Sequence, residues 1–184
     1  MAVRSEILGG ISLRFIDVMI GVILGLGFQW WPNFTELWQY IAFIFVYLDI
    51  TDYWIDYSPS LRKFPPKREV DILIDMAIMF SIFLYIYSTQ LTITYFLYSY
   101  ILFNIFDIIW LGRAYLEYSP SNADSLFLKA WILFNGIEII YTLGIVFLAM
   151  WGPTTALIAI SIFIALRVIT RILASLMYKR VYFF

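Results

Sequence analysis

Long apolar runs recur six times along this chain, separated by short polar or aromatic stretches. Each run holds about twenty residues, and an α-helix of that length spans the roughly 30 Å hydrocarbon core of a bilayer. The predicted spans are Ile11–Trp30, Leu37–Tyr57, Asp71–Ser88, Tyr95–Tyr115, Lys129–Met150 and Thr155–Tyr178. The pattern predicts an all-α fold, a single domain over residues 1–184 that forms a polytopic integral membrane protein with six transmembrane helices.

The connections between the spans alternate in charge. Three of them (Trp30–Glu36, Ser88–Thr92 and Trp151–Thr154) are short, and Glu36 is their only charged residue. The other connections and the chain ends carry basic residues: Arg4, Arg14, Arg62, Lys63, Lys67, Arg68, Arg113, Lys129, Lys179 and Arg180. By the positive-inside rule both termini are cytoplasmic, and the spans pair as three hairpins. We therefore expect a multi-pass protein of the cell membrane, with the lipid bilayer as its main partner.

The composition narrows the possible chemistry. The chain has 63% hydrophobic residues and contains neither cysteine nor histidine. Thiolate ligands and imidazole acid–base chemistry are therefore excluded, and any bound metal would be held by oxygen, as Mg²⁺ is. The formal net charge of −1 gives no reason to expect a nucleic-acid partner.

Two short segments share the sequence Tyr-Ser-Pro-Ser. Asp56–Ser60 ends the second span, and Glu117–Ser121 ends the fourth. Two explanations are open: the hairpin is triplicated, or Ser-Pro merely stops a helix at the membrane interface, since the residue before proline disfavours helical geometry.

Carboxylates gather where the second span leads into the third. Asp49, Asp52 and Asp56 lie on one helical face, and Asp71 and Asp75 share a face at the start of the next span. Charges inside apolar spans are costly and mark function by default. The residues predicted to bind Mg²⁺ are Asp49, Asp52, Asp56, Asp71 and Asp75, with Asp75 as the candidate catalytic residue; those predicted to bind phosphate are Arg62, Lys63, Lys67 and Arg68. The alternative is a set of solvated helix ends, with Asp71 and Asp75 favoured by the helix dipole.

The acidic segment is similar to motifs of two enzyme families. The spacing of Asp49, Asp52 and Asp56 resembles the first acidic motif of UbiA-type prenyltransferases, whose aspartates hold magnesium and a prenyl diphosphate. Asp49, Asp52, Asp71 and Asp75 resemble the four-aspartate motif of CDP-alcohol phosphotransferases, which have six helices. Either resemblance implies a Mg²⁺-dependent transferase acting on a diphosphate-linked lipid.

Five further charges lie deep inside the predicted spans. The acids are Asp17, Asp107 and Glu138, and the bases are Arg167 and Arg171, which share one face of the sixth span. Opposite charges at such depth usually pair, so we expect a buried charge network that joins the two arginines to two of the three acids. The functional alternative is a path for cations or protons.

Phe15-x-Asp17, together with Tyr53-Trp54, resembles six-helix potassium channels that carry a Phe-Ser-Asp motif. Gly21, Gly25 and Gly27 in the first span indicate close packing against another helix or another subunit.

Three functions thus remain open. The first is a Mg²⁺-dependent transferase with a cytoplasm-facing acidic site. The second is a cation or proton channel or transporter, for which we expect a homo-oligomer. The third is a non-catalytic subunit of a larger membrane complex. A transferase requires the carboxylates at the second-to-third-span junction to converge.

Overall fold

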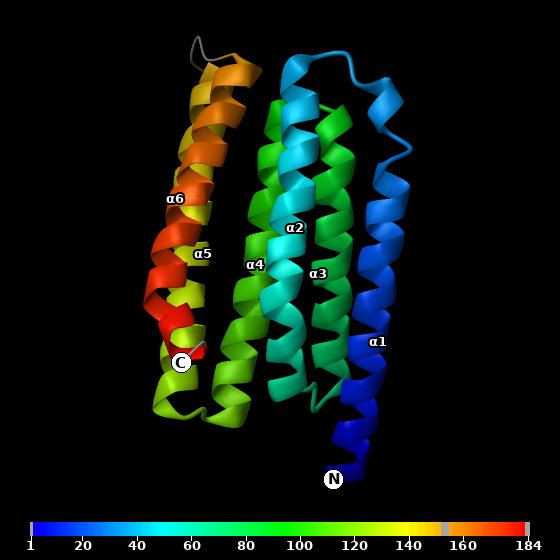
Figure 1. The fold of residues 1–184 in the computed structure, drawn as a ribbon, viewed down its shortest axis with the longest axis vertical. Helices are drawn as coiled ribbons and strands as arrows, with labels where there is room; N and C mark the ends of the chain where they lie inside the picture. Colours follow the sequence, from blue (N-terminus) through cyan, green and yellow to red (C-terminus); the bar gives the residue numbers. More distant parts are fainter. Residues whose placement is uncertain (1, 152–154, 183–184) are drawn as a thin grey trace. The chain divides into compact units, whose positions relative to one another are not determined.

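The computed structural model describes residues 2–151 and 155–182 of the chain. They form six long helices: α1 (Ala2–Gly27), α2 (Leu37–Lys63), α3 (Glu69–Tyr87), α4 (Ile93–Tyr118), α5 (Asn122–Trp151) and α6 (Ala156–Tyr182). Short 3₁₀ turns lie at Trp31–Asn33 and Ser88–Gln90 (Figure 1). The described residues contain no strand, so the predicted all-α class is confirmed.

Five segments of the described chain are long and apolar enough to cross a membrane: Ser12–Asn33, Glu69–Gln90, Ile93–Tyr118, Asn122–Met150 and Ala156–Met177. This is what a multi-pass membrane protein requires. Helix α2 is not among them, although it is 27 residues long. Its three aspartates and its tyrosines and tryptophans lower its mean hydropathy, so a sixth crossing by Leu37–Tyr57 stays a prediction.

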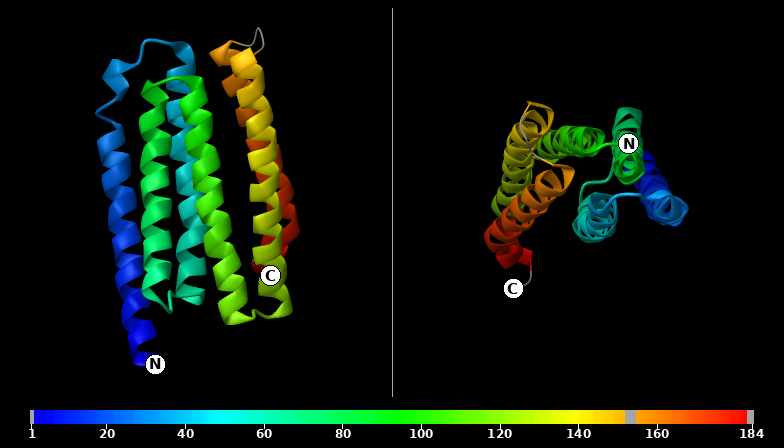
Figure 2. Two further views of the ribbon diagram at one scale, coloured as in Figure 1. Left: turned by 180° about the vertical axis from the view of Figure 1, so that it is seen from behind. Right: turned by 90° about the horizontal axis from the view of Figure 1, so that it is seen from above.

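The chain divides into two compact units, residues 1–91 and 92–184, called here the N-terminal and C-terminal units. In the N-terminal unit α1 packs against both α2 and α3, and the three helices form a triangle when seen end-on (Figure 2). In the C-terminal unit α5 packs against both α4 and α6. Compact packing thus groups the helices in threes, whereas the short connecting turns had suggested pairs.

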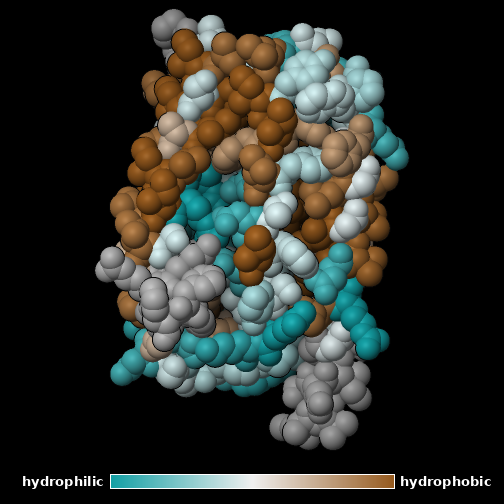
Figure 3. Space-filling model, viewed as in Figure 1, coloured by the Kyte–Doolittle hydropathy of each residue, from teal (hydrophilic) through white to brown (hydrophobic). Residues whose placement is uncertain are grey.

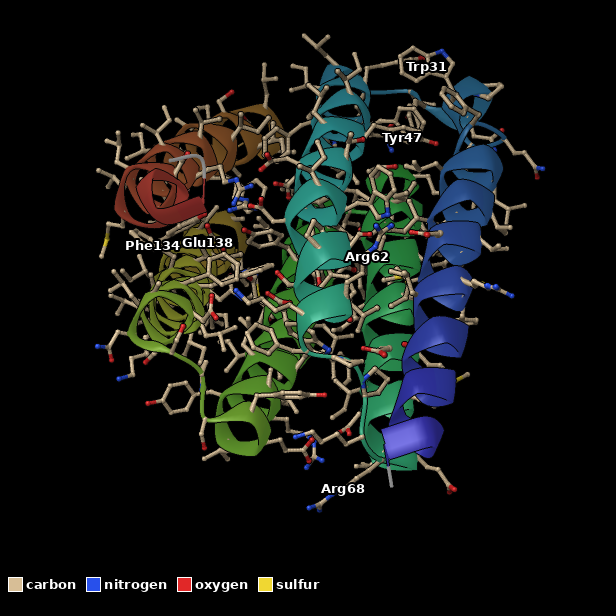
Figure 4. The ribbon with its side chains drawn as sticks, turned by 60° about the horizontal axis from the view of Figure 1, so that its bottom comes forward. Trp31, Tyr47, Arg62, Arg68, Phe134 and Glu138 are labelled. Atoms are coloured by element: carbon tan, nitrogen blue, oxygen red, sulfur yellow. The ribbon has the colours of Figure 1, made fainter. Side chains whose placement is uncertain are left out.

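Aromatic residues close the α1–α2 turn. Trp31 contacts Tyr40 and Phe43 with ring centroids 5.0 and 5.2 Å apart, and Phe43 in turn contacts Tyr47 at 4.5 Å. The Tyr47 hydroxyl donates a hydrogen bond of 2.5 Å to the carbonyl of Leu24 (Figure 4). These contacts join the end of α1 to α2 through side chains rather than through the turn alone.

The three glycines in the second half of α1 differ in their surroundings. A methyl group on Gly27 would collide with the Tyr47 hydroxyl and lie 2.8 Å from a methyl carbon of Ile86, so α1 approaches its neighbours closely there. A methyl group on Gly21 or Gly25 would meet nothing within 4 Å. The predicted packing role is therefore confirmed within the chain at Gly27 only.

The two Tyr-Ser-Pro-Ser segments adopt different structures. Helix α2 runs through Pro59 to Lys63, and the Ser60 hydroxyl donates to the Asp56 carbonyl at 2.7 Å, near the point where proline removes a backbone donor. Helix α4 ends at Tyr118, where Ser119 takes a left-handed φ of 43° before Pro120. The helix-stop explanation is therefore right for the second segment and wrong for the first.

The outward surface of the long helices is apolar. On α6 the exposed side chains include Ile162, Ile169, Ile172 and Leu176. Hydrophobic residues cover most of the upper left of the view, where α6 lies (Figure 3). A helix with this surface is suited to contact with lipid tails.

Candidate functional site

Asp75 is the centre of a hydrogen-bond network inside the N-terminal unit. Its carboxylate is 0% exposed, two turns into α3. One oxygen accepts from the Tyr57 hydroxyl of α2 at 2.7 Å, and the other accepts from the Ser12 hydroxyl of α1. The Tyr57 ring stacks on Tyr53, with centroids 5.0 Å apart. All three helices of the unit thus meet at this one carboxylate.

Asp71 has a local structural role at the start of α3. Its carboxylate accepts the backbone N–H groups of Lys67 at 3.1 Å and Arg68 at 2.8 Å. A carboxylate in this position satisfies donors that the first turn of a helix leaves unpaired. This is the helix-end alternative that the sequence left open, and both bonds go to the same oxygen of Asp71.

The other three acids of the predicted metal site lie along α2. Asp49 is buried, and Asp52 and Asp56 are half-buried. Within the described residues, no three acidic side chains come close enough together to hold a metal ion. The structure therefore does not bring Asp49, Asp52, Asp56, Asp71 and Asp75 together as a preformed Mg²⁺ site.

The four basic residues predicted to bind phosphate all lie at the connection between α2 and α3. Arg62 and Lys63 end α2, and Lys67 and Arg68 precede α3. All four are exposed. Arg68 projects away from the helices where α2 passes into α3 (Figure 4).

Glu138 is the corresponding centre of the C-terminal unit. It is 1% exposed on α5, and one of its oxygens contacts the Arg167 guanidinium at 2.6 Å and the Thr170 hydroxyl at 2.7 Å, both from α6. Its other oxygen accepts from the Tyr100 hydroxyl of α4. The guanidinium also lies 6.0 Å from the centre of the Tyr100 ring. Again three helices meet at one buried carboxylate (Figure 4 labels Glu138).

The other members of the predicted charge network are Asp107, Asp17 and Arg171. Asp107 is buried and accepts from the Asn135 amide at 2.6 Å. Asp17 belongs to the N-terminal unit and accepts from the Trp54 indole at 3.0 Å. Arg171 is half-buried on α6. One of the expected pairings, Arg167 with Glu138, is therefore present, and neutral side chains also donate to Asp107 and Asp17.

Sequence reasoning missed the neutral donors. They are Ser12, Trp54, Tyr57, Tyr100, Asn135 and Thr170. The spacing could have indicated that two of these residues face the buried charges. Asn135 precedes Glu138 by three positions and Thr170 follows Arg167 by three, so the members of each pair lie on one helical face. The partners contributed by other helices could not be found by spacing.

Asp17 belongs to an exposed strip of α1, which we call the α1 face: Asp17, Val18, Gly21, Val22 and Gly25. All five residues are exposed. At 100° per residue, the five side chains together fall within a sector of about 140° around the helix axis. The α1 face thus combines one carboxylate with two glycines and two exposed valines inside the apolar segment Ser12–Asn33.

Comparison with protein-family models, curated proteins and solved structures found no match. The chemistry of this protein is therefore read from its own residues: two carboxylates that are hydrogen-bonded inside three-helix units, an exposed basic connection, and one exposed carboxylate on α1.

Proposed function

We propose that the protein moves a cation or protons across a membrane as a homo-oligomer, with the α1 face lining the path. The observation that supports this is the exposure of Asp17 on a helix of spanning length. Asp17 is the sixth residue of the segment Ser12–Asn33, about 8 Å from its start by helical rise. The cost of exposing a carboxylate to lipid rises with depth to about 2.5–3.5 kcal/mol at the helix centre, so this face is suited to water or protein rather than lipid.

The residues around Asp17 fit an oligomer. Gly21 and Gly25 have open space beside them, and small residues let the α1 helices of neighbouring copies approach closely. Carboxylates from several copies would then lie near one another, where they repel unless a cation or a proton sits among them. The Trp54 indole holds the Asp17 carboxylate in place at 3.0 Å. The resemblance of Phe15-x-Asp17 to the potassium-channel motif agrees with this function.

Six crossings with both termini in the cytoplasm belong to the same proposal. On this topology the Arg62–Arg68 connection lies on the cytoplasmic side of the cell membrane, and the turns at Trp31–Asn33 and Ser88–Gln90 lie outside.

The transferase ranks second because its metal ligands have other partners. Asp71 accepts two backbone N–H groups at the start of α3 and Asp75 accepts two hydroxyls, so Mg²⁺ would compete with these hydrogen bonds. The transferase function is favoured by the exposed basic residues at the α2–α3 junction, which could bind a diphosphate. A rise in melting temperature with millimolar Mg²⁺, lost in Asp75→Asn, would return this function to first place.

The transport function is tested by flux into liposomes. We expect purified protein to carry K⁺ or protons down a gradient, read by dyes specific for each. Asp17→Asn should lower that flux on the order of tenfold, because the carboxylate concentrates cations in the path. The matched control is Glu117→Gln, which removes a carboxylate that pairs with Arg113 at 2.6 Å on α4. Flux no greater than in protein-free liposomes, or equal loss in both variants, would overturn the proposal.

A further inference from the structure

The connection between α2 and α3 has a rigid backbone and exposed charges. The Phe64 ring and Pro66 are buried, and the Phe64 N–H donates to the Ser60 carbonyl at 2.8 Å. At the other end Asp71 binds the backbone of Lys67 and Arg68. The backbone is therefore hydrogen-bonded at both ends, while the four basic side chains are exposed. We call Arg62, Lys63, Lys67 and Arg68 the basic loop.

The basic loop lies next to a spanning segment. Glu69–Gln90 begins immediately after Arg68, so the loop is at the level of the lipid headgroups in any arrangement in which α3 crosses the bilayer. The nearby acids are Glu69, which is exposed, Asp56, which is half-buried, and Asp71, which is buried against the backbone. Four basic side chains outnumber the two acids that reach the surface.

We propose that the basic loop binds the phosphate of an anionic membrane lipid. Guanidinium groups bind phosphate through two parallel hydrogen bonds, and the loop has an arginine at each end of a segment stiffened by Pro65 and Pro66. The start of α3 is not the anion site, because Asp71 already accepts the Lys67 and Arg68 N–H groups. The phosphate is held by side chains, and the acyl chains lie along the apolar surface of α3. This site is independent of the transport path on α1.

The test is a titration of the full-length protein, in a zwitterionic detergent, with short-chain phosphatidylglycerol, followed by the melting temperature. The lipid should raise the melting temperature, because it binds the folded protein only. Arg68→Gln should weaken the apparent affinity about fivefold, which corresponds to the usual contribution of one basic residue at an anionic surface. Lys129→Gln is the matched control, since it removes one exposed charge from the start of α5 and should weaken affinity less than about twofold.

Two further titrations test whether the rise in melting temperature needs both the anionic headgroup and the acyl chains. Short-chain phosphatidylcholine at the same concentration should give no shift that depends on Arg68, because its headgroup carries no net charge. Inorganic phosphate should give none either, because it lacks the acyl chains. An equal shift with phosphatidylcholine, an equal shift with free phosphate, or equal losses in Arg68→Gln and Lys129→Gln would each overturn the proposal.

Discussion

Glu138 and Asp17 are both carboxylates on long apolar helices, but their surroundings are opposite. Glu138 is 1% exposed and is bonded by Arg167, Thr170 and Tyr100 from the two neighbouring helices. Asp17 is exposed and accepts from the Trp54 indole. A carboxylate whose oxygens are satisfied inside its unit stabilises that unit. A carboxylate on the outer face of a spanning helix instead indicates what the helix contacts outside the chain.

Asp75 belongs with Glu138 in this comparison. It too is buried, and hydroxyl groups from two other helices of its unit bond its oxygens. The donors differ in strength, because a guanidinium carries a full positive charge and a hydroxyl does not. We therefore expect both centres to hold their helices together, with the larger loss of stability when the charged donor at Glu138 is removed.

The largest predicted effect is on the Glu138 centre. Arg167→Leu leaves the buried carboxylate without its cation, and breaking a buried pair in this way costs about 3–5 kcal/mol. The free energy of unfolding in detergent measures the loss. Arg113→Leu is the control: its partner Glu117 lies one turn along α4, the Arg113 side chain is 30% exposed, and such a pair contributes about 0.2–0.5 kcal/mol.

A double mutant separates the pair from a general effect of leucine at position 167. Glu138→Gln removes the charge but keeps an oxygen for the Thr170 hydroxyl. Added to Arg167→Leu, it should restore part of the lost stability. Equal losses in the single and double variants would show that Arg167 does not act through Glu138.

A smaller effect is predicted at Asp75. Ser12→Ala removes one hydroxyl donor from a buried carboxylate, and hydrogen bonds to charged groups contribute about 1.5–3 kcal/mol. Ser99→Ala is the matched control, because its hydroxyl bonds the Tyr95 carbonyl of the same helix at 2.8 Å, and its loss should stay within about 0.5 kcal/mol. Equal thermal denaturation of the two variants would contradict the structural role of Asp75.

The sequence predicted the helices well, because an uninterrupted apolar run leaves the backbone no better way to satisfy its polar groups in a membrane. It predicted helix ends less well. Asp56–Ser60 and Glu117–Ser121 share Tyr-Ser-Pro-Ser, yet one continues α2 and the other ends α4. Burial of Ser58 and Ser60 in the N-terminal unit accompanies the first outcome, and burial depends on packing that local sequence does not contain.

The candidate-site residues show the same limit, since contacts between helices depend on packing that local sequence does not contain. Charge and depth alone predicted that Arg167 would pair with one of three deep acids, because few partners can satisfy a charge inside a span, and the structure identifies that acid as Glu138. The hydroxyl partners of Asp75 could not be predicted, because nothing in the sequence indicates that Tyr57 and Ser12 reach this carboxylate from other helices. Spacing along one helix can place side chains on a face, but it cannot identify what the neighbouring helices bring to that face.

The most direct test of the account asks whether the α1 face meets a second copy of the chain. The protein contains no cysteine, so a single introduced thiol reports on one position only. Val22→Cys on the α1 face should form a disulfide-linked dimer on mild oxidation in native membranes. Ile140→Cys, which is 72% exposed on α5, should stay monomeric on a non-reducing gel. A monomeric Val22→Cys, or a dimer at Ile140→Cys alone, would contradict the central claim.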